Sequence, residues 1–248
     1  MTQPSSSIEA GLPQQPEQVD FAPHFRAARA IPEADAAVMD AIHALRFDVY
    51  CLECGFLPAD AHPLGRETDA ADAHSAHFYA MNRQQQLAGY VRLVPPDAGG
   101  RFPFQEHCNQ LYAQVRLPDP SLCGEISRLM VHAHYRRRRG DNLAGVTVVQ
   151  DAPPTVERRN DSPQIMLCLF RQMYVHCVGA GVRYWYAAME RPLARALARL
   201  GFGFDAIGPQ TDYYGPVAPY LADLRALEAG VGAAKPELLR WMQTQLAA

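Results

Sequence analysis

The chain has 248 residues, a 48% hydrophobic and 20% charged composition, and a formal net charge of -3. This composition is typical of a globular protein with room for one sizeable α/β domain, and it excludes a fibrous or wholly disordered chain. Because the chain is slightly acidic and has no apolar run of spanning length, we expect neither a nucleic-acid partner nor a membrane span.

The first 20 residues are rich in Pro, Ser and Gln and have no hydrophobic period, which predicts a disordered leader over residues 1–20. A single domain is expected over residues 21–248. The six cysteines form no regular framework and no secretory signal is visible, which indicates a reducing, cytoplasmic setting. Cys51 and Cys54 form a C-x-x-C without a second pair, so we interpret them as packing residues and expect no metal site.

The hydrophobic pattern predicts an alternation of helices and strands. Strands are expected at residues 24–30, 77–82, 87–95, 125–132 and 184–189. Helices are expected from Pro32 to about residue 53 and at residues 102–114, 165–182, 191–202 and 235–246, with a hairpin-like region over 204–224. An inserted loop is expected at about residues 134–162. This order predicts an α+β or three-layer α/β fold with a mixed, mostly antiparallel sheet, and no P-loop, serine-hydrolase or zincin motif is found.

Charged side chains interrupt two of the predicted strands. Glu125 and Arg128 lie in "EISRLMVH" and Arg92 lies in "LAGYVRLVP". In a regular strand Glu125 and Arg128 would point to opposite faces, and a β-bulge between them would bring both to one face. Buried arginines need acidic partners. The candidate partners are Glu67, Asp69, Asp72 and Glu125.

Two interpretations of these charges remain open from the residues alone. One is a structural ion-pair network at a sheet end. The other is a cleft in which guanidinium and carboxylate groups bind a small zwitterion such as an amino acid, because guanidinium binds carboxylate in bidentate fashion and aspartate binds ammonium.

A series of positions resembles a known family. Its members in chain order are Arg46, Tyr50, Phe56, Asp69, Asp72, the "RL" at Arg92, "EISR" with Glu125 and Arg128, and "LARLGF" at residues 197–202. The series resembles the acyl-homoserine-lactone (autoinducer) synthases and the N-acyl amino acid synthases of the GNAT superfamily. With the insert after "EISRLMV" and the "YYGPVAPY" ending, it is most similar to the acyltransferases associated with PEP-CTERM/exosortase systems.

The resemblance implies a GNAT-like acyl-CoA N-acyltransferase fold, mixed and mostly antiparallel with flanking helices, and an enzyme without a bound cofactor. It implies transfer of a fatty acyl group, as a phosphopantetheine thioester on acyl carrier protein or CoA, to the amine of a small acceptor such as an amino acid. Glu125 would be the general base and Arg128 would orient it or bind the acceptor carboxylate. The acceptor pocket would be formed by Arg46, Tyr50, Phe56, Asp69, Asp72 and Arg92.

Several departures and alternatives accompany the resemblance. Phe56 stands where autoinducer synthases usually have tryptophan, which favours an amino acid over S-adenosylmethionine as acceptor. The alternatives are an acyl-homoserine-lactone synthase that uses S-adenosylmethionine, and a non-catalytic sensor that binds an acyl group or pantetheine. His132 is a second candidate base, whereas Cys123 lacks a histidine that would make it a nucleophile. Four arginines could dock acyl carrier protein or line a solvated loop: Arg136, Arg137, Arg138 and Arg139.

Overall fold

The computed structural model describes residues 19–136 and 161–244 of the chain. In this part of the chain eight strands form one sheet, in the order β1-β2-β3-β4-β5-β8-β6, with β7 paired to β8. The main strands are β1 (Phe25–Ala30), β2 (Ala76–Asn82), β3 (Leu87–Val94), β4 (Cys123–Val131), β5 (Tyr184–Glu190) and β8 (Pro216–Asp223). The strands β6 (Asp205–Ala206) and β7 (Thr211–Asp212) are short. Only β4 and β5 pair in parallel; the other pairs are antiparallel.

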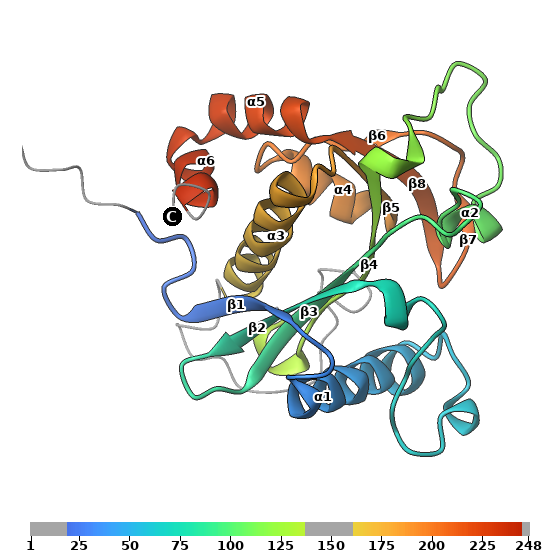
Figure 1. The fold of residues 1–248 in the computed structure, drawn as a ribbon, viewed down its shortest axis with the longest axis vertical. Helices are drawn as coiled ribbons and strands as arrows, with labels where there is room; N and C mark the ends of the chain where they lie inside the picture. The colour runs from blue at the N-terminus through green and yellow to red at the C-terminus, as the bar shows by residue number, and fades with distance from the viewer. Residues whose placement is uncertain (1–18, 137–160, 245–248) are drawn as a thin grey trace, which may run out of the picture.

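Helices cover both faces of this sheet (Figure 1). The helix α1 (Ala36–Phe47), which continues as a π-helix over Asp48–Glu53, packs on one face through a cluster that includes Tyr90 and Met130. The long helix α3 (Asp161–Ala180) packs on the other face against alternate residues such as Val91 and Leu93. The remaining helices are α2 (Phe104–His107), α4 (Arg191–Ala198), α5 (Leu224–Ala234) and α6 (Pro236–Gln243).

The structure confirms most of the predicted elements and the mixed, mostly antiparallel sheet between helices. Strand alternation was readable because β3 turns alternate residues toward α1 and α3. The predicted leader, apart from residues 19 and 20, and most of the predicted insertion lie outside the described residues. The single-domain assignment stays a prediction.

Two parts of the prediction were wrong. The helix predicted over residues 102–114 is reduced to α2, because Phe102, Phe104 and Cys108 instead pack into a small core with Cys123 and Tyr186. The helix α5 was not predicted. It begins directly after β8, where the Asp223 side chain caps it by accepting a hydrogen bond from the Arg225 N–H.

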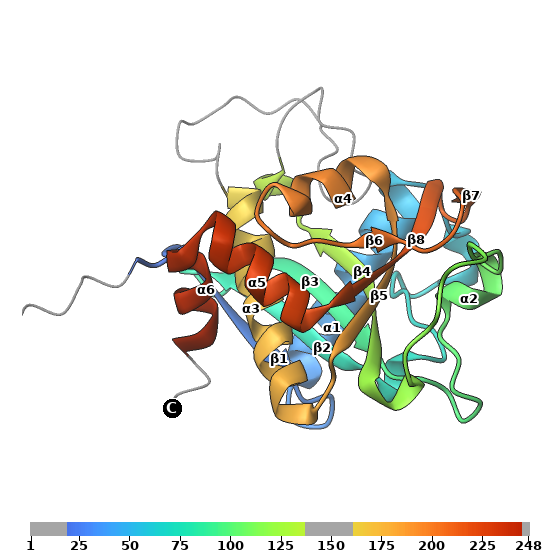
Figure 2. The same ribbon diagram turned by 90° about the horizontal axis from the view of Figure 1, so that it is seen from above.

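The parallel pair β4 and β5 separates part-way along its length (Figure 2 shows the same sheet from above). Their register runs from Cys123 opposite Tyr184 to Ile126 opposite Ala187, and the pairing recorded for the described residues ends there although both strands continue. The diverging strand ends open a gap in the sheet at the point where Glu125 and Arg128 occur.

The packing of α3 on β3 gives a test of this architecture. Gly89 lies where a Cβ atom would meet Ile165 Cγ2 at 2.5 Å and the Met130 carbonyl oxygen at 3.0 Å. We expect Gly89→Ala to lower the free energy of unfolding by about 1–3 kcal/mol through overpacking, measured by denaturant unfolding. Gly179→Ala, in the same helix with nothing within 4 Å of its added Cβ, is the control and should leave stability unchanged or raised. Equal losses for the two variants would contradict the close helix-sheet contact.

Candidate active site

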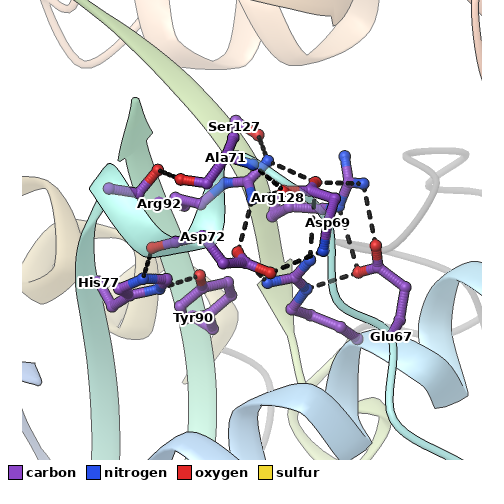
Figure 3. Close-up of polar contacts among 11 residues, drawn as sticks. Glu67, Asp69, Ala71, Asp72, His77, Tyr90, Arg92, Ser127 and Arg128 are labelled. Carbon is purple, nitrogen blue, oxygen red and sulfur yellow. Dashed lines mark hydrogen bonds and ion pairs between the residues drawn. The ribbon is translucent and has the colours of Figure 1, made fainter. Parts of the chain in front are cut away.

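Six charged residues form a buried cluster on the α1 face of the sheet (Figure 3). Three are cations, on α1 (Arg46), β3 (Arg92) and β4 (Arg128), and three are anions from the loop before β2: Glu67, Asp69 and Asp72. Arg46 donates to Glu67 at 2.5 Å and to Asp72 at 2.6 Å. Arg92 donates to both oxygens of Asp69 at 2.5 and 2.9 Å, and to Asp72 at 2.6 Å.

Arg128 completes the cluster. Its Nη2 donates to Glu67 and Asp69, each at 3.0 Å, and its guanidinium lies 4.6 Å from the centre of the Tyr50 ring. The three cations and three anions therefore compensate one another. This finding supports the network interpretation of the strand charges, and it leaves Arg128 already engaged by two carboxylates.

Burial and pairing act in opposite directions on these carboxylates. Burial raises the pKa of Glu67, but hydrogen bonds from Arg46 and Arg128 outweigh it and lower the pKa to about 2. Asp72 likewise has its pKa lowered, because the charges of Arg46 and Arg92 outweigh its burial. Both side chains are thus ionised throughout the physiological range.

The bulge that the sequence required is present in β4. The register with β3 shifts between Tyr90 and Arg92, so that two residues of β4 lie opposite Val91. Arg128 has a φ of 55°, a left-handed conformation that a non-glycine residue seldom adopts. The shift brings Arg128 to the same face as Ser127, beside the acidic loop.

A buried histidine holds the acidic loop against the sheet. His77 Nε2 lies 3.0 Å from the Asp72 carbonyl oxygen, which can only accept, so this nitrogen carries the proton. The other ring nitrogen therefore accepts from the Tyr90 hydroxyl at 2.7 Å. Burial lowers the pKa of His77, which keeps the ring neutral. His77 and Tyr90 thereby fix the backbone from which the Asp72 carboxylate reaches Arg46 and Arg92.

Glu125 has a different environment from the carboxylates of the cluster. One of its oxygens accepts a hydrogen bond from the Phe104 N–H at 2.9 Å, and the described residues give it no ion pair. Only 4% of the residue is exposed. Burial raises the pKa of Glu125 to about 7, although the Phe104 hydrogen bond and the more distant Arg92 and Arg128 lower it. A carboxyl with this pKa can take up or release a proton near neutral pH.

Two cavities meet beside Glu125. A cavity of about 130 Å³ lies between the diverging ends of β4 and β5 and is lined by Glu125, Tyr50 and Phe56 among others. A larger cavity of about 700 Å³ lies on the side of Asp69 and Arg92. Four residues line both cavities: Ser127, Arg128, Tyr213 and Tyr214.

The structure thus brings together most of the residues predicted from the sequence, with one change in their pairing. Tyr50 and Phe56 stack edge to face, with ring centres 5.8 Å apart, at the border of the smaller cavity. Glu125 and Arg128 line this cavity together, but the described contacts of Arg128 do not include Glu125. The residues that the sequence did not single out are Ser127, Tyr213 and Tyr214. The "YYG" turn was the available signal, and its place beside β4 follows from the tertiary fold.

Arg136 does not suit the docking role proposed for it from the sequence. Its side chain is buried, its Nε donates to the Val131 carbonyl oxygen at 2.5 Å, and its Nη1 pairs with Glu53. It connects the end of β4 to the π-helix and does not present its charge to solvent. Arg137, Arg138 and Arg139 lie outside the described residues.

The other reactive side chains considered from the sequence lie apart from this site or are inactive in it. His132 accepts from the His134 N–H and lines a separate cavity with α1 residues such as Ala41. Burial raises the pKa of the Cys123 thiol to about 11, which disfavours a thiolate nucleophile. Within residues 19–136 and 161–244 there is no group of three or more potential metal ligands. No helix of that part is long and apolar enough to cross a membrane.

The charge cluster makes a prediction about stability. Removing the Arg46 guanidinium would leave Glu67 and Asp72 buried without their main partner, so we expect Arg46→Met to lower the free energy of unfolding by about 3–5 kcal/mol. Arg66→Met, at an exposed pair with Asp40, is the control and should have little effect. Because the pKa of Glu67 is lowered, the stability that it contributes at pH 7 is lost as the pH falls from about 4.5 toward 2. Urea unfolding at pH 7 and pH 4 measures both effects, and equal stability of the two variants would contradict the role of the cluster.

Comparison with known proteins places the fold. Residues 45–145 match the acetyltransferase (GNAT) domain family. The CoA-dependent acyl-homoserine lactone synthase BjaI, solved with SAM and isopentyl-CoA, superposes with a TM-score of 0.58 and 19% identity over 87% of this chain and 89% of that chain. The AHL synthase LasI superposes with a TM-score of 0.54 and 16% identity over 84% of this chain and 95% of that chain.

A third solved structure is FeeM, an N-acyl amino acid synthase from uncultured soil microbes, with a TM-score of 0.49 and 12% identity over 85% of this chain and 97% of that chain. No curated protein matches the chain. The fold expected from the sequence is confirmed, whereas the likeness to PEP-CTERM/exosortase-associated acyltransferases stays a prediction. The chain contains a GNAT acetyltransferase domain match and has the GNAT fold in the form found in acyl-homoserine lactone synthases.

Proposed function

We propose that the chain is an N-acyltransferase that moves an acyl group from a phosphopantetheine thioester, on acyl carrier protein or CoA, to the amine of a small acceptor such as an amino acid. The observation that carries this proposal is the position of Glu125. A carboxyl with a pKa of about 7 lines a cavity in the gap between β4 and β5, next to a second cavity that contains an accessible carboxylate. Such a pair of adjoining cavities suits the transfer of a group between two substrates.

The smaller cavity is the proposed site of the thioester. Beyond Ile126 and Ala187 the two strands no longer pair with each other, so their facing backbone groups are available to a pantetheine arm and to the thioester carbonyl oxygen. Backbone N–H groups directed at that oxygen would stabilise the negative charge that develops on it during attack.

The donor's carrier is proposed to approach along α4. Leu193 and Leu197 of this helix line the smaller cavity, while its arginines at a spacing of four residues are exposed: Arg191, Arg195 and Arg199. A stripe of positive charge at the cavity suits the phosphate of the donor or the acidic surface of acyl carrier protein. This face takes the place of Arg136 as the proposed docking surface.

The larger cavity is the proposed site of the acceptor. Asp69 lines it, and its side chain is 29% exposed, compared with 1% for Glu67 and 14% for Asp72. Asp69 is therefore the carboxylate of the cluster that an incoming ammonium group can reach. Arg46, Arg92 and Asp72 hold Asp69 and the inner wall in place and need not contact the acceptor.

The reaction follows from these positions. The neutral amine of the acceptor attacks the thioester carbon, Glu125 takes the proton that the nitrogen loses, and the C–S bond breaks as the amide forms. The sulfur leaves as thiolate and takes up a proton to give the thiol. Ionised Glu125 is needed at the start of each cycle, and Arg128, already bound to Glu67 and Asp69, acts as part of the wall between the cavities.

The alternative of a synthase that uses S-adenosylmethionine is less favoured by the charges of the site. Arg128 covers the face of Tyr50, at 4.6 Å, and lies 6.0 Å from the centre of the Tyr214 ring. A sulfonium cation would meet a guanidinium where it could otherwise rest on an aromatic face. Mass spectrometry of organic extracts from cells that express the protein separates N-acyl amino acids from acyl-homoserine lactones. Extracts that contain neither product would favour the non-catalytic alternative.

The role of Glu125 gives a prediction about activity and pH. We expect kcat/KM to rise about tenfold per pH unit below pH 7 and to level off above it, because the base must be ionised. Glu125→Gln should lower kcat at pH 8 by about 10²–10⁴-fold, the range for a lost general base. Release of free thiol from acyl-CoA in the presence of mixed amino acids measures both.

The control separates catalysis from folding. Because burial raises the pKa of Glu125, ionising it lowers the stability of the fold as the pH rises from about 4.5 through 7, so Glu125→Gln should keep or raise the melting temperature at pH 8. Glu237→Gln, on the exposed face of α6, should leave both activity and melting temperature unchanged. Turnover by Glu125→Gln at the rate of the unchanged protein would exclude Glu125 as the base.

The role of Asp69 gives a prediction about the acceptor. Asp69→Asn keeps the size of the side chain but removes the charge that would bind the ammonium group. We expect the KM for the acceptor to rise about ten- to a hundredfold, which corresponds to the loss of a hydrogen bond to a charged group, with the KM for the donor unchanged. Asp40→Asn, at an exposed position outside both cavities, is the control. Equal changes in both KM values would argue against Asp69 as an acceptor residue.

A further inference from the structure

The far end of the smaller cavity is closed by an aromatic side chain. Phe170, on α3, lines this cavity and is 2% exposed. Its ring is held edge to face by Trp185 of β5, at 5.9 Å between ring centres, and by Phe202, at 5.4 Å. Trp185 is itself fixed, since its indole N–H donates to Cys177 Sγ at 3.1 Å. The floor of the cavity is therefore braced on two sides.

The walls between this floor and Glu125 are apolar. They are formed by Ile126 and Leu129 of β4, Ala187 and Met189 of β5, and Leu193 and Leu197 of α4. An apolar tail can be buried along such walls, whereas a charged or strongly polar group would lose its hydration without gaining a partner.

The size of the cavity limits that tail. Its volume is about 130 Å³. A dry apolar cavity of about 150 Å³ in another protein holds one benzene molecule, which has six carbons. A chain of twelve or more carbons would not fit unless Phe170 moved out of its position between Trp185 and Phe202.

We propose that the acyl group transferred by this protein is short, of about four to six carbons, and that Phe170 is the residue that sets this limit. The inference rests on the proposed function, because it takes the gap between β4 and β5 as the site of the thioester. It narrows the donor from fatty acyl thioesters in general to short-chain ones and assigns the specificity to one side chain outside the charge cluster.

The test uses S-acyl-pantetheine thioesters of four, six, ten and sixteen carbons, which carry the arm common to both possible donors. Affinities measured by calorimetry on the full chain should rise about fourfold for each added methylene up to six carbons, the gain for burying one methylene. The ten-carbon thioester should then bind at least tenfold more weakly than the six-carbon one. Equal or tighter binding of the ten-carbon thioester would overturn the chain-length limit.

Variants of the floor and the wall should move the limit in opposite directions. Phe170→Ala should strengthen binding of the ten-carbon thioester at least tenfold and leave the four-carbon one within threefold. Phe170→Leu, a milder change, should shift the limit in the same direction and keeps the test available if the alanine variant does not fold. Leu193→Phe should instead weaken binding of the six-carbon thioester.

The control is Phe78→Ala, which removes a fully buried ring from the same core at a position that does not line the cavity. It should leave the order of affinities unchanged, so a general loosening of the core would be recognised. An unchanged profile in both Phe170 variants would overturn the role of Phe170. Binding of none of the four thioesters would instead overturn the proposed donor site, and with it this inference.

Discussion

The compensation of three buried guanidinium groups by three carboxylates is the constraint on which the rest of the site depends. Arg46, Arg92 and Arg128 come from three different elements, and their partners come from one loop over residues 67–72. A buried charge is tolerated only with a partner, so each ion pair also fixes the position of its backbone. The cluster thereby joins α1, β3 and β4 to the loop, and it builds the wall that separates the two cavities.

The local conformation of β4 follows from the same requirement. A regular strand would direct Arg128 toward the α3 face, where its neighbours such as Ile126 and Val131 are apolar. The bulge and the positive φ of Arg128 avoid this burial, at the cost of about 1–3 kcal/mol of backbone strain. Contacts with Glu67, Asp69 and the Tyr50 ring offset the strain. The strained residue therefore marks the functional end of the strand.

Sequence reasoning reached the parts of this arrangement that have a local cause. Alternation in β3 and β4 predicted strands, and charges within them predicted both acidic partners and the bulge. Contacts between distant segments were not accessible in the same way. The burial of Arg136 depends on Glu53, 83 residues away, so the run of four arginines resembled a solvated surface. The expected pairing of Arg128 with Glu125 failed because nearer carboxylates in space, Glu67 and Asp69, were more distant in sequence.

The neutrality of the cluster also explains how a general base can exist a few residues away from three arginines. Arg92 and Arg128 lower the pKa of Glu125, and Asp69 raises it. If the cluster carried an excess of positive charge, that field would oppose the effect of burial and return the pKa toward the value of an ordinary carboxyl, too acidic to accept a proton efficiently near pH 7. Because the carboxylates balance the guanidiniums, burial dominates at Glu125. The structural network and the proposed catalytic residue are thus linked through one electrostatic balance, and neither interpretation of the strand charges is complete without the other.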